Sequence, residues 1–248
     1  MKFFLPLEQF ELSVLIPVYL FNFDISFNTM SFYLINVSFI IYIFLFLNIY
    51  KALLIPTIFQ TIVEYSYKFI YSIIIQQAGK HGLKYFALLF TTFYFILFSN
   101  LLGLIPYGFT TTSHLMITLS LAFTFNFGFI ILGFYLHGLH FLNLFVPSGA
   151  PKALLPLIIT IEIVSYLIRT ISLSVRLFAN MLAGHTLLYI MASFVMAFIN
   201  SKFVVISLLP FIIILAVYVL EFAIAFIQAY VFLILLVIYL NDSLHPGH

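Results

Sequence analysis

The apolar positions of this chain fall into five long stretches, and short segments between them hold most of the charged residues, prolines and glycines. Each stretch meets or exceeds the roughly 20 residues that a helix needs to cross the hydrocarbon core of a bilayer. The predicted spans cover residues 31–50, 85–105, 114–136, 153–200 and 203–241. The pattern therefore predicts an all-α integral membrane protein, with residues 1–248 forming a single membrane domain.

A further helix is predicted over residues 57–78, where the pattern is different. Its polar side chains recur at every fourth position, while the apolar side chains lie off that stripe: the polar set is Gln60, Glu64, Lys68, Ser72 and Gln76. Residues four apart share one face of a helix. The segment is therefore predicted to be an amphipathic helix at the membrane interface, with Glu64 and Lys68 forming an i,i+4 pair.

The spans are predicted to form two hairpins after the N-terminal span. Residues 85–105 and 114–136 are separated by a short turn at Pro106, Tyr107 and Gly108. The last two spans turn near Lys202 and are unusually long. Between Pro156 and Asn200 there is no internal proline to break a helix, which would extend about 65 Å, roughly twice the hydrocarbon core. We expect these two helices to be strongly tilted.

Composition agrees with a membrane protein and narrows the possible chemistry. Hydrophobic residues make up 65% of the chain and charged residues 6%, far below the roughly 25% of soluble domains. There is no basic run to bind nucleic acid, and with no cysteine the chain has no thiolate metal site. The histidines show no metal-binding spacing, and the N-terminus shows no removable presequence. No nucleotide-binding loop occurs, so we expect no cofactor.

Lysine placement predicts the orientation in the membrane. Five spans put the two termini on opposite sides. The loops at 51–84 and 137–152 share one side and carry most of the lysines: Lys51, Lys68, Lys80, Lys84 and Lys152. By the positive-inside rule, this side and the C-terminus face the compartment in which the chain is made.

Charged residues inside the spans are the candidates for function. Glu162, Arg169 and Arg176 are spaced by seven and share one helical face, Glu221 lies deep in the last span, and Asp242 lies just beyond it. An ionised side chain at mid-membrane costs about 2.5–3.5 kcal/mol, so each needs a partner or a wet path. Function is the default hypothesis for such residues, whereas a structural scaffold does not need them.

Folding the two long helices antiparallel about Lys202 brings these groups together. Positions whose numbers add to 404 then lie at equal depth, so Arg176 meets Gln228, Glu162 meets Asp242, and His185 comes within two residues of Glu221. This order places Glu162 near one surface, Arg176 midway, and the titratable pair His185 and Glu221 toward the other surface. It indicates two proton routes that Arg176 keeps apart.

Four segments carry a resemblance to a known family. Residues 172–185 read SLSVRLFANMLAGH, residues 221–231 read EFAIAFIQAYV, residues 99–107 read SNLLGLIPY, and residues 7–11 read LEQFE. These closely resemble the motifs of subunit a of F-type ATP synthases, over nearly the whole chain. The histidine at 185 and the glutamate at 221 resemble the residues that the mitochondrial branch of that family has at these positions.

The resemblance implies a proton-channel subunit of the mitochondrial inner membrane that has no nucleotide site of its own. Its N-terminus would face the intermembrane space and its C-terminus the matrix. Its partners would be the c-subunit ring, the peripheral stalk, other membrane subunits of the synthase, and lipid. Two offset half-channels would load and unload the ring carboxylates, coupling proton flow to rotation.

The resemblance also implies a role for each candidate. Arg176 would face the ring carboxylates, with Asn180, Gln228 and Arg169 in support. The intermembrane-space half-channel would use His185 and Glu221, and the matrix half-channel Glu162 and Asp242.

Several simpler readings stay open. Arg169 could merely neutralise Glu162 or bind a lipid headgroup, and Asp242 could belong to a solvated tail. Asn100 and Asn126 are predicted to hydrogen-bond between helices. The whole chain could instead be a proton-coupled transporter or a respiratory-complex subunit. A transporter would be expected to have broken helices or repeated halves, and the sequence shows neither.

Overall fold

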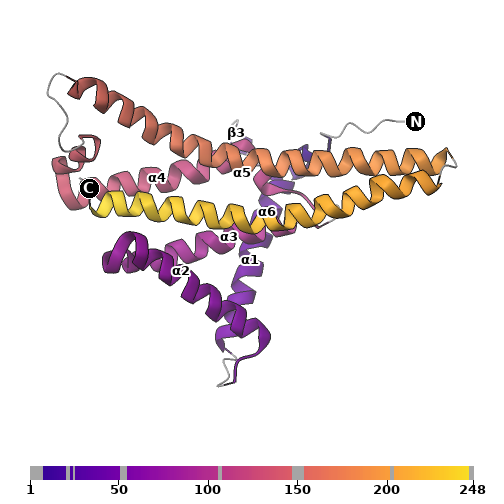
Figure 1. The fold of residues 1–248 in the computed structure, drawn as a ribbon, viewed down its shortest axis with the longest axis horizontal. Coiled ribbons are helices and arrows are strands. Elements are labelled where there is room, and N and C mark those ends of the chain that lie inside the picture. The colour runs from indigo at the N-terminus through magenta and orange to yellow at the C-terminus, as the bar shows by residue number, and fades with distance from the viewer. Residues whose placement is uncertain are drawn as a thin grey trace. The chain divides into compact units, whose positions relative to one another are not determined.

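The computed structural model describes residues 8–20, 23–24, 26–50, 55–105, 108–146, 154–201 and 204–245. Long helices dominate these residues, and Figure 1 shows them in order along the chain. They are α1 (Thr29–Tyr50), α2 (Ile58–Gly82), α3 (Phe86–Gly103), α4 (Leu115–His137), α5 (Leu155–Asn200) and α6 (Val204–Leu244). Short 3-10 turns accompany them: η1 (Glu8–Phe10), η2 (Leu83–Tyr85), η3 (Thr111–Ser113) and η4 (Gly138–Phe145).

Five helical segments within the described residues are long and apolar enough to cross a membrane. They are Thr29–Asn48, Ile58–Gly103, Leu115–Leu142, Leu155–Asn200 and Ser207–Leu244. The predicted all-α membrane class is therefore confirmed. The two longest helices are uninterrupted, as the lack of internal breakers in α5 predicted. Pro156 lies in the first turn of α5, where a missing N–H breaks no helical hydrogen bond.

The chain divides into two compact units, which are described separately. Unit 1 comprises residues 1–42, 95–115 and 176–228, and unit 2 comprises residues 43–94, 116–175 and 229–248. Helices α5 and α6 each contribute one half to either unit. Lys202, the predicted turning point, lies outside the described residues, as do Pro106 and Tyr107.

Both units pair α5 with α6 in an antiparallel register. In unit 1, Gly184 lies against Glu221, and Met181 shares a buried cluster with Ala225 and Leu104 of the α3–α4 connection. In unit 2, the rings of Tyr166 and Tyr239 lie 5.4 Å apart. The paired residue numbers add to 405 or 406, against the predicted 404.

Polar residues join other helices within each unit. In unit 1, the Asn100 side chain of α3 donates to the Ala225 carbonyl of α6 at 3.5 Å. In unit 2, the Asn126 amide of α4 donates to the hydroxyl of Thr170 on α5. Both asparagines therefore hydrogen-bond between helices, as predicted. Such bonds fix the rotation of one apolar helix against another, which apolar side chains alone define poorly.

The amphipathic helix α2 differs from the prediction in length and in its ion pair. It runs to Gly82 rather than to residue 78, bends at Gly79 where φ is +64°, and continues through η2 into α3. Glycine suits that bend because it adopts positive φ without a Cβ clash. The predicted Glu64–Lys68 pair is not formed: Glu64 accepts from Gln60 at 3.0 Å, while Lys68 lies over the ring of Tyr65.

Two small antiparallel strand pairs precede α1, and the sequence did not predict them. Strand β1 (Val14–Ile16) pairs with β4 (Phe27–Asn28), and β2 (Tyr19–Leu20) pairs with β3 (Phe23–Asp24). Each pair supplies only one or two register positions. Strands this short carry too little apolar alternation for a pattern to reveal them.

Candidate functional site

Arg176 lies on an exposed face of α5 in unit 1. Ala179 and Ala183, three and seven residues further on, are exposed on the same face. No ion pair of Arg176 with another described residue is recorded. The small alanine side chains leave the backbone on this face open to close approach, which is how membrane helices pack against a partner. This face therefore presents a cation beside small side chains, and the cation has no ion-pair partner among the described residues.

Glu221 is buried on the facing side of α6, with 5% of its surface exposed. A Cβ built on Gly184 would lie 2.8 Å from Glu221 Cδ, so a larger residue at 184 would require the end of the Glu221 side chain to move. Neither carboxyl oxygen has a hydrogen-bond partner among the described residues. A buried acid without a partner costs several kcal/mol when ionised unless solvent reaches it.

His185 follows Gly184 on α5 and is half-buried. Its Nε2 atom is buried and has no hydrogen-bond partner in the described part of the chain. The structure thus brings His185 next to the residue that Glu221 contacts, but records no direct hydrogen bond between the two side chains. Both groups keep a buried polar atom available to a third species.

The sequence did not predict a buried polar segment between α3 and α4. Residues Thr110 to Ser113 are all at most 6% exposed, and Ser99 and Asn100 at the end of α3 are equally buried. Five polar atoms of this region lack a partner among the described residues: Ser99 Oγ, Asn100 Oδ1, Thr111 Oγ1, Thr112 Oγ1 and His114 Nε2. The run TTTSH at 110–114, unusually polar for this chain, is the signal that could have revealed it.

Two hydrogen bonds fix this region against α6 on both sides of Glu221. The Asn100 amide donates to the Ala225 carbonyl at 3.5 Å, one turn after Glu221. The Tyr218 hydroxyl donates to the Leu104 carbonyl at 3.3 Å, just before it. The end of α3 and the first residue after it therefore pack against the Glu221 segment of α6.

The environment of His114, at the end of this region, shifts the pKa of its side chain. It lies one residue before α4 and stacks on Phe109, with ring centroids 5.2 Å apart. Burial lowers its pKa from the ordinary value of 6.5, because desolvation disfavours the charged imidazolium. His114 is therefore neutral at pH 7.

A second group of charges lies in unit 2. Asp242 on α6 is half-buried and interacts electrostatically first with Arg169 and then with Glu162, both half-buried on α5. The positive charge of Arg169 thus offsets the negative charge of Asp242. Arg169 also lies seven residues after Glu162 on the same helix. The rings of Tyr166 and Tyr239, tilted by 59° to each other, lie beside Asp242 and Arg169. The structure places two carboxylates and one guanidinium together at the α5–α6 pair.

Of the three predicted supporting residues, Asn180 and Gln228 lie in unit 1 and Arg169 lies in unit 2. Gln228 is buried on α6, 5% exposed, and Asn180 is half-buried on α5. No hydrogen bond joins either side chain to Arg176, although all three residues are described. The described residues also contain no cluster of three or more His, Asp or Glu side chains that could hold a metal ion.

Comparisons with known proteins identify the family. The family model for the ATP synthase A chain matches residues 30–241. The chain belongs to the ATP synthase subunit a family. It is 48% identical to ATP synthase subunit a of Acanthamoeba castellanii, covering 99% of both chains. It is 47% identical to subunit a of Bartonella bacilliformis, over 98% of this chain and 97% of the relative, and 45% identical to that of Rhizobium etli, over 98% of both.

Membership of the subunit a family explains why charges survive in these helices. The chain is the proton-translocating subunit of the membrane sector of the ATP synthase, it works with the other subunits of that complex, and it is not itself a catalytic subunit. Two of these relatives are bacterial and one comes from an amoeba, so they do not single out the mitochondrial branch.

Proposed function

We propose that this chain moves protons through two offset half-channels that meet the carboxylates of a c-subunit ring and are separated by Arg176. Glu221 and His185 serve the intermembrane-space half-channel. Glu162 and Asp242 serve the matrix half-channel, with Arg169 as their counter-charge. Asn180 and Gln228 support the face that carries Arg176.

The observation that carries this proposal is the burial of Glu221 without a partner. Buried polar atoms in proteins are almost always hydrogen-bonded to protein or to water. Glu221 and His185 contribute three buried atoms that no described residue satisfies, and the Ser99–His114 region contributes five more. Hydration of these atoms would form a wet route that ends at a titratable acid, and a proton half-channel requires such a route.

The exposed face of Arg176 supports the second part of the proposal. Arginine stays charged at any relevant pH, so it can discharge an incoming ring carboxylate and cannot itself relay a proton. A charge that crosses a membrane at 100 mV dissipates about 2.3 kcal/mol. A fixed cation between the two half-channels therefore prevents a leak that would uncouple proton flow from rotation.

The membrane and the orientation are also part of the proposal. We assign the chain to the mitochondrial inner membrane, because His185 and Glu221 occupy the positions where the mitochondrial branch has these residue types. The lysine-rich loops put the C-terminus in the matrix and the N-terminus toward the intermembrane space.

Single-cysteine labelling tests the half-channels, because the chain contains no cysteine of its own. In the assembled complex, Glu221→Cys should react with a polar thiol reagent added from the intermembrane-space side, and Glu162→Cys with reagent added from the matrix side. Phe127→Cys is the control, because Phe127 is 64% exposed on the apolar surface of α4 and should react poorly from either side. Reaction of both test positions from one side would mean a single continuous pore and would overturn the proposal.

A further inference from the structure

A buried polar group in unit 2 joins α4, α5 and α6. It consists of Asn126, Thr170 and Tyr239, one from each helix and all at most 2% exposed. The Asn126 amide donates to the Thr170 hydroxyl, which itself donates to the Tyr166 carbonyl at 3.3 Å. The Tyr239 hydroxyl lies near Thr170 from the other side of the pair. Thr170 is therefore the point at which the three helices bring polar side chains together.

The hydrogen bonds of this polar group are incomplete. Asn126 Oδ1 and the Tyr239 hydroxyl are buried and have no hydrogen-bond partner among the described residues. A threonine hydroxyl oxygen can accept two hydrogen bonds, and the Asn126 amide supplies only one to Thr170. The group thus offers two acceptors and one donor to a further species. Buried polar atoms are almost always bonded to protein or to water.

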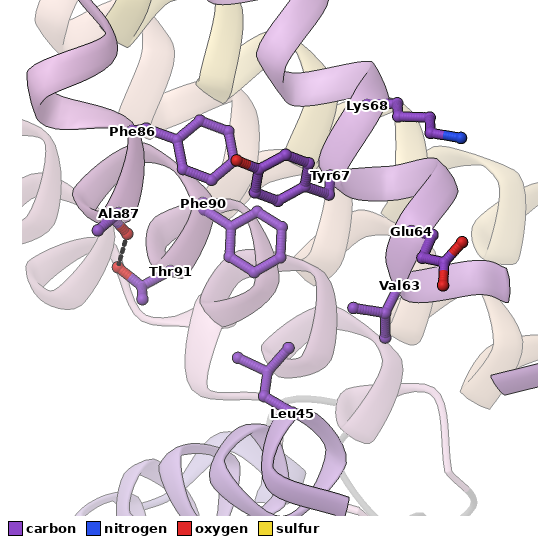
Figure 2. Close-up of a pocket in the computed structure, with 9 residues that line it drawn as sticks. All are labelled: Leu45, Val63, Glu64, Tyr67, Lys68, Phe86, Ala87, Phe90 and Thr91. Carbon is purple, nitrogen blue, oxygen red and sulfur yellow. Dashed lines mark hydrogen bonds between the residues drawn. The ribbon is translucent and has the colours of Figure 1, made fainter. Parts of the chain in front are cut away.

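Threonine hydroxyls on α3, by contrast, are satisfied within their own helix. Thr91 donates to the Ala87 carbonyl at 2.9 Å (Figure 2), and Thr92 donates to the Leu89 carbonyl at 2.9 Å. Such local bonds need no further species. Burial of a hydroxyl in a helix of unit 2 therefore does not by itself leave a polar atom without a partner.

We propose that Asn126, Thr170 and Tyr239 bind one water molecule that forms the inner end of the matrix half-channel. The water donates to Asn126 Oδ1 and to the Thr170 hydroxyl oxygen, and it accepts from the Tyr239 hydroxyl. Buried waters typically make about three hydrogen bonds to groups that would otherwise be unsatisfied. These three bonds use both hydrogens of the water and complete the hydrogen bonding of the group.

The charges assigned to the matrix half-channel lie next to this site. Tyr239 precedes Asp242 by three residues on the same face of α6, about 4.5 Å along the axis. Arg169 is adjacent to Thr170 in the chain and interacts electrostatically with Tyr239. Both charged residues are half-buried, so solvent that reaches them has one helical turn left to the site. The inference rests on the proposed matrix half-channel and extends it inward.

Reaction of a single cysteine with Ag⁺ tests whether water reaches the site. Ag⁺ is close to water in size and binds thiolates. The complex carrying Thr170→Cys is placed in vesicles with the matrix side outward, Ag⁺ is added outside, and the remaining thiol is measured by alkylating the denatured chain. Thr92→Cys is the matched control, because Thr92 is also buried but bonds within α3. We expect position 170 to react at least about tenfold faster, because apolar burial disfavours the reactive thiolate.

Two tyrosine variants show whether the Tyr239 hydroxyl holds the water. Combined with Thr170→Cys, Tyr239→Phe removes that hydroxyl and keeps the ring that lies 5.4 Å from Tyr166. The loss of one hydrogen bond changes an equilibrium by about fivefold, so the reaction at position 170 should slow by about that factor. Tyr166→Phe is the control and should leave the rate unchanged, because its hydroxyl is not part of the site. Equal slowing by both variants would overturn the role of Tyr239.

The water site fails if positions 170 and 92 react equally slowly, which would show that the polar group is dry. It also fails if position 170 reacts only with Ag⁺ added from the intermembrane-space side. Glu162→Cys in the same vesicles separates these results from a failure of the half-channel itself. Reaction of position 162 but not of position 170 from the matrix side would remove the water site and leave the matrix half-channel in place.

Discussion

Replacing Gly184 with alanine tests whether the carboxyl group of Glu221 must stay where α5 leaves room for it. The added Cβ would lie 2.8 Å from Glu221 Cδ, whereas carbon atoms in contact lie about 3.5–4.0 Å apart. The carboxyl group must therefore withdraw by roughly 1 Å. Misplacing a reacting group by that distance can reduce a rate by about 100-fold. We expect Gly184→Ala to lower ATP-driven proton pumping by about 10- to 100-fold.

Helix stability cannot account for such a loss. Alanine favours a helix over glycine by about 1 kcal/mol, so the substitution strengthens α5 apart from the contact with Glu221. Gly128→Ala is the matched control: Gly128 is exposed in the middle of α4, and a Cβ there meets nothing within 4 Å. Quenching of a pH-sensitive dye in reconstituted vesicles measures pumping, with subunit content checked in each preparation.

A second substitution separates a steric effect from a general one. Glu221→Asp shortens the side chain by one methylene and moves the carboxyl group away from residue 184. If the clash is the cause, the double variant Gly184→Ala/Glu221→Asp should have a higher pumping rate than the product of the fractional rates of the two single variants. Normal pumping by Gly184→Ala, or an equal loss in Gly128→Ala, would refute the reasoning that links Glu221 to the proton path.

Two further predictions concern charges. Arg176→Ala and Arg176→Lys should both abolish coupled pumping in the same vesicles, because lysine is a more hydrated cation that can lose its proton; coupled pumping in either variant would contradict the role of a fixed charge. His114 binds its proton less tightly in the folded chain than in the unfolded one, so its contribution to stability is complete above about pH 6.5 and decreases as the pH falls below that value. The apparent melting temperature of the complex should therefore drop more between pH 7.5 and 5.5 for the wild type than for His114→Gln, and equal drops would exclude His114.

The helices were predictable because membrane spans are constrained by length and polarity alone. An apolar run of 20 or more residues has no alternative in a bilayer, where backbone groups must be satisfied within the segment. The same simplicity explains why α5 was predictable as one helix from its lack of breakers. The sequence could not reveal the two strand pairs before α1, because they are too short to show alternation.

The polar contacts of α2 were harder to predict. Glu64 could pair with Lys68 one turn later or with Gln60 one turn earlier, and both spacings suit a helix equally. The structure has the Gln60 contact, and Lys68 turns toward Tyr65. Exposed pairs of this kind differ by only a few tenths of a kcal/mol, so spacing alone cannot rank them.

The buried segment at Thr110–His114 was missed for a different reason. The segment lies between the predicted spans 85–105 and 114–136, and connections between helices are normally solvated. Here Asn100 at the end of α3 and Leu104 just after it hydrogen-bond to α6, and the hydroxyl-bearing residues Thr110–Ser113 of the connection are buried. Burial of a polar loop is a tertiary property that a local pattern cannot express.

The α5–α6 pairing shows that the sequence predicts the depth of a residue in the membrane better than the direction in which its side chain points. A shift of one residue in the paired numbers changes the depth of each residue by only about 1.5 Å, but it turns a side chain by 100° about the helix axis. The predicted register therefore put His185 and Glu221 at nearly the same depth. The observed rotation instead points the Glu221 carboxyl at Gly184, one position before His185. A larger residue at 184 would therefore displace the Glu221 carboxyl group from its place beside Gly184.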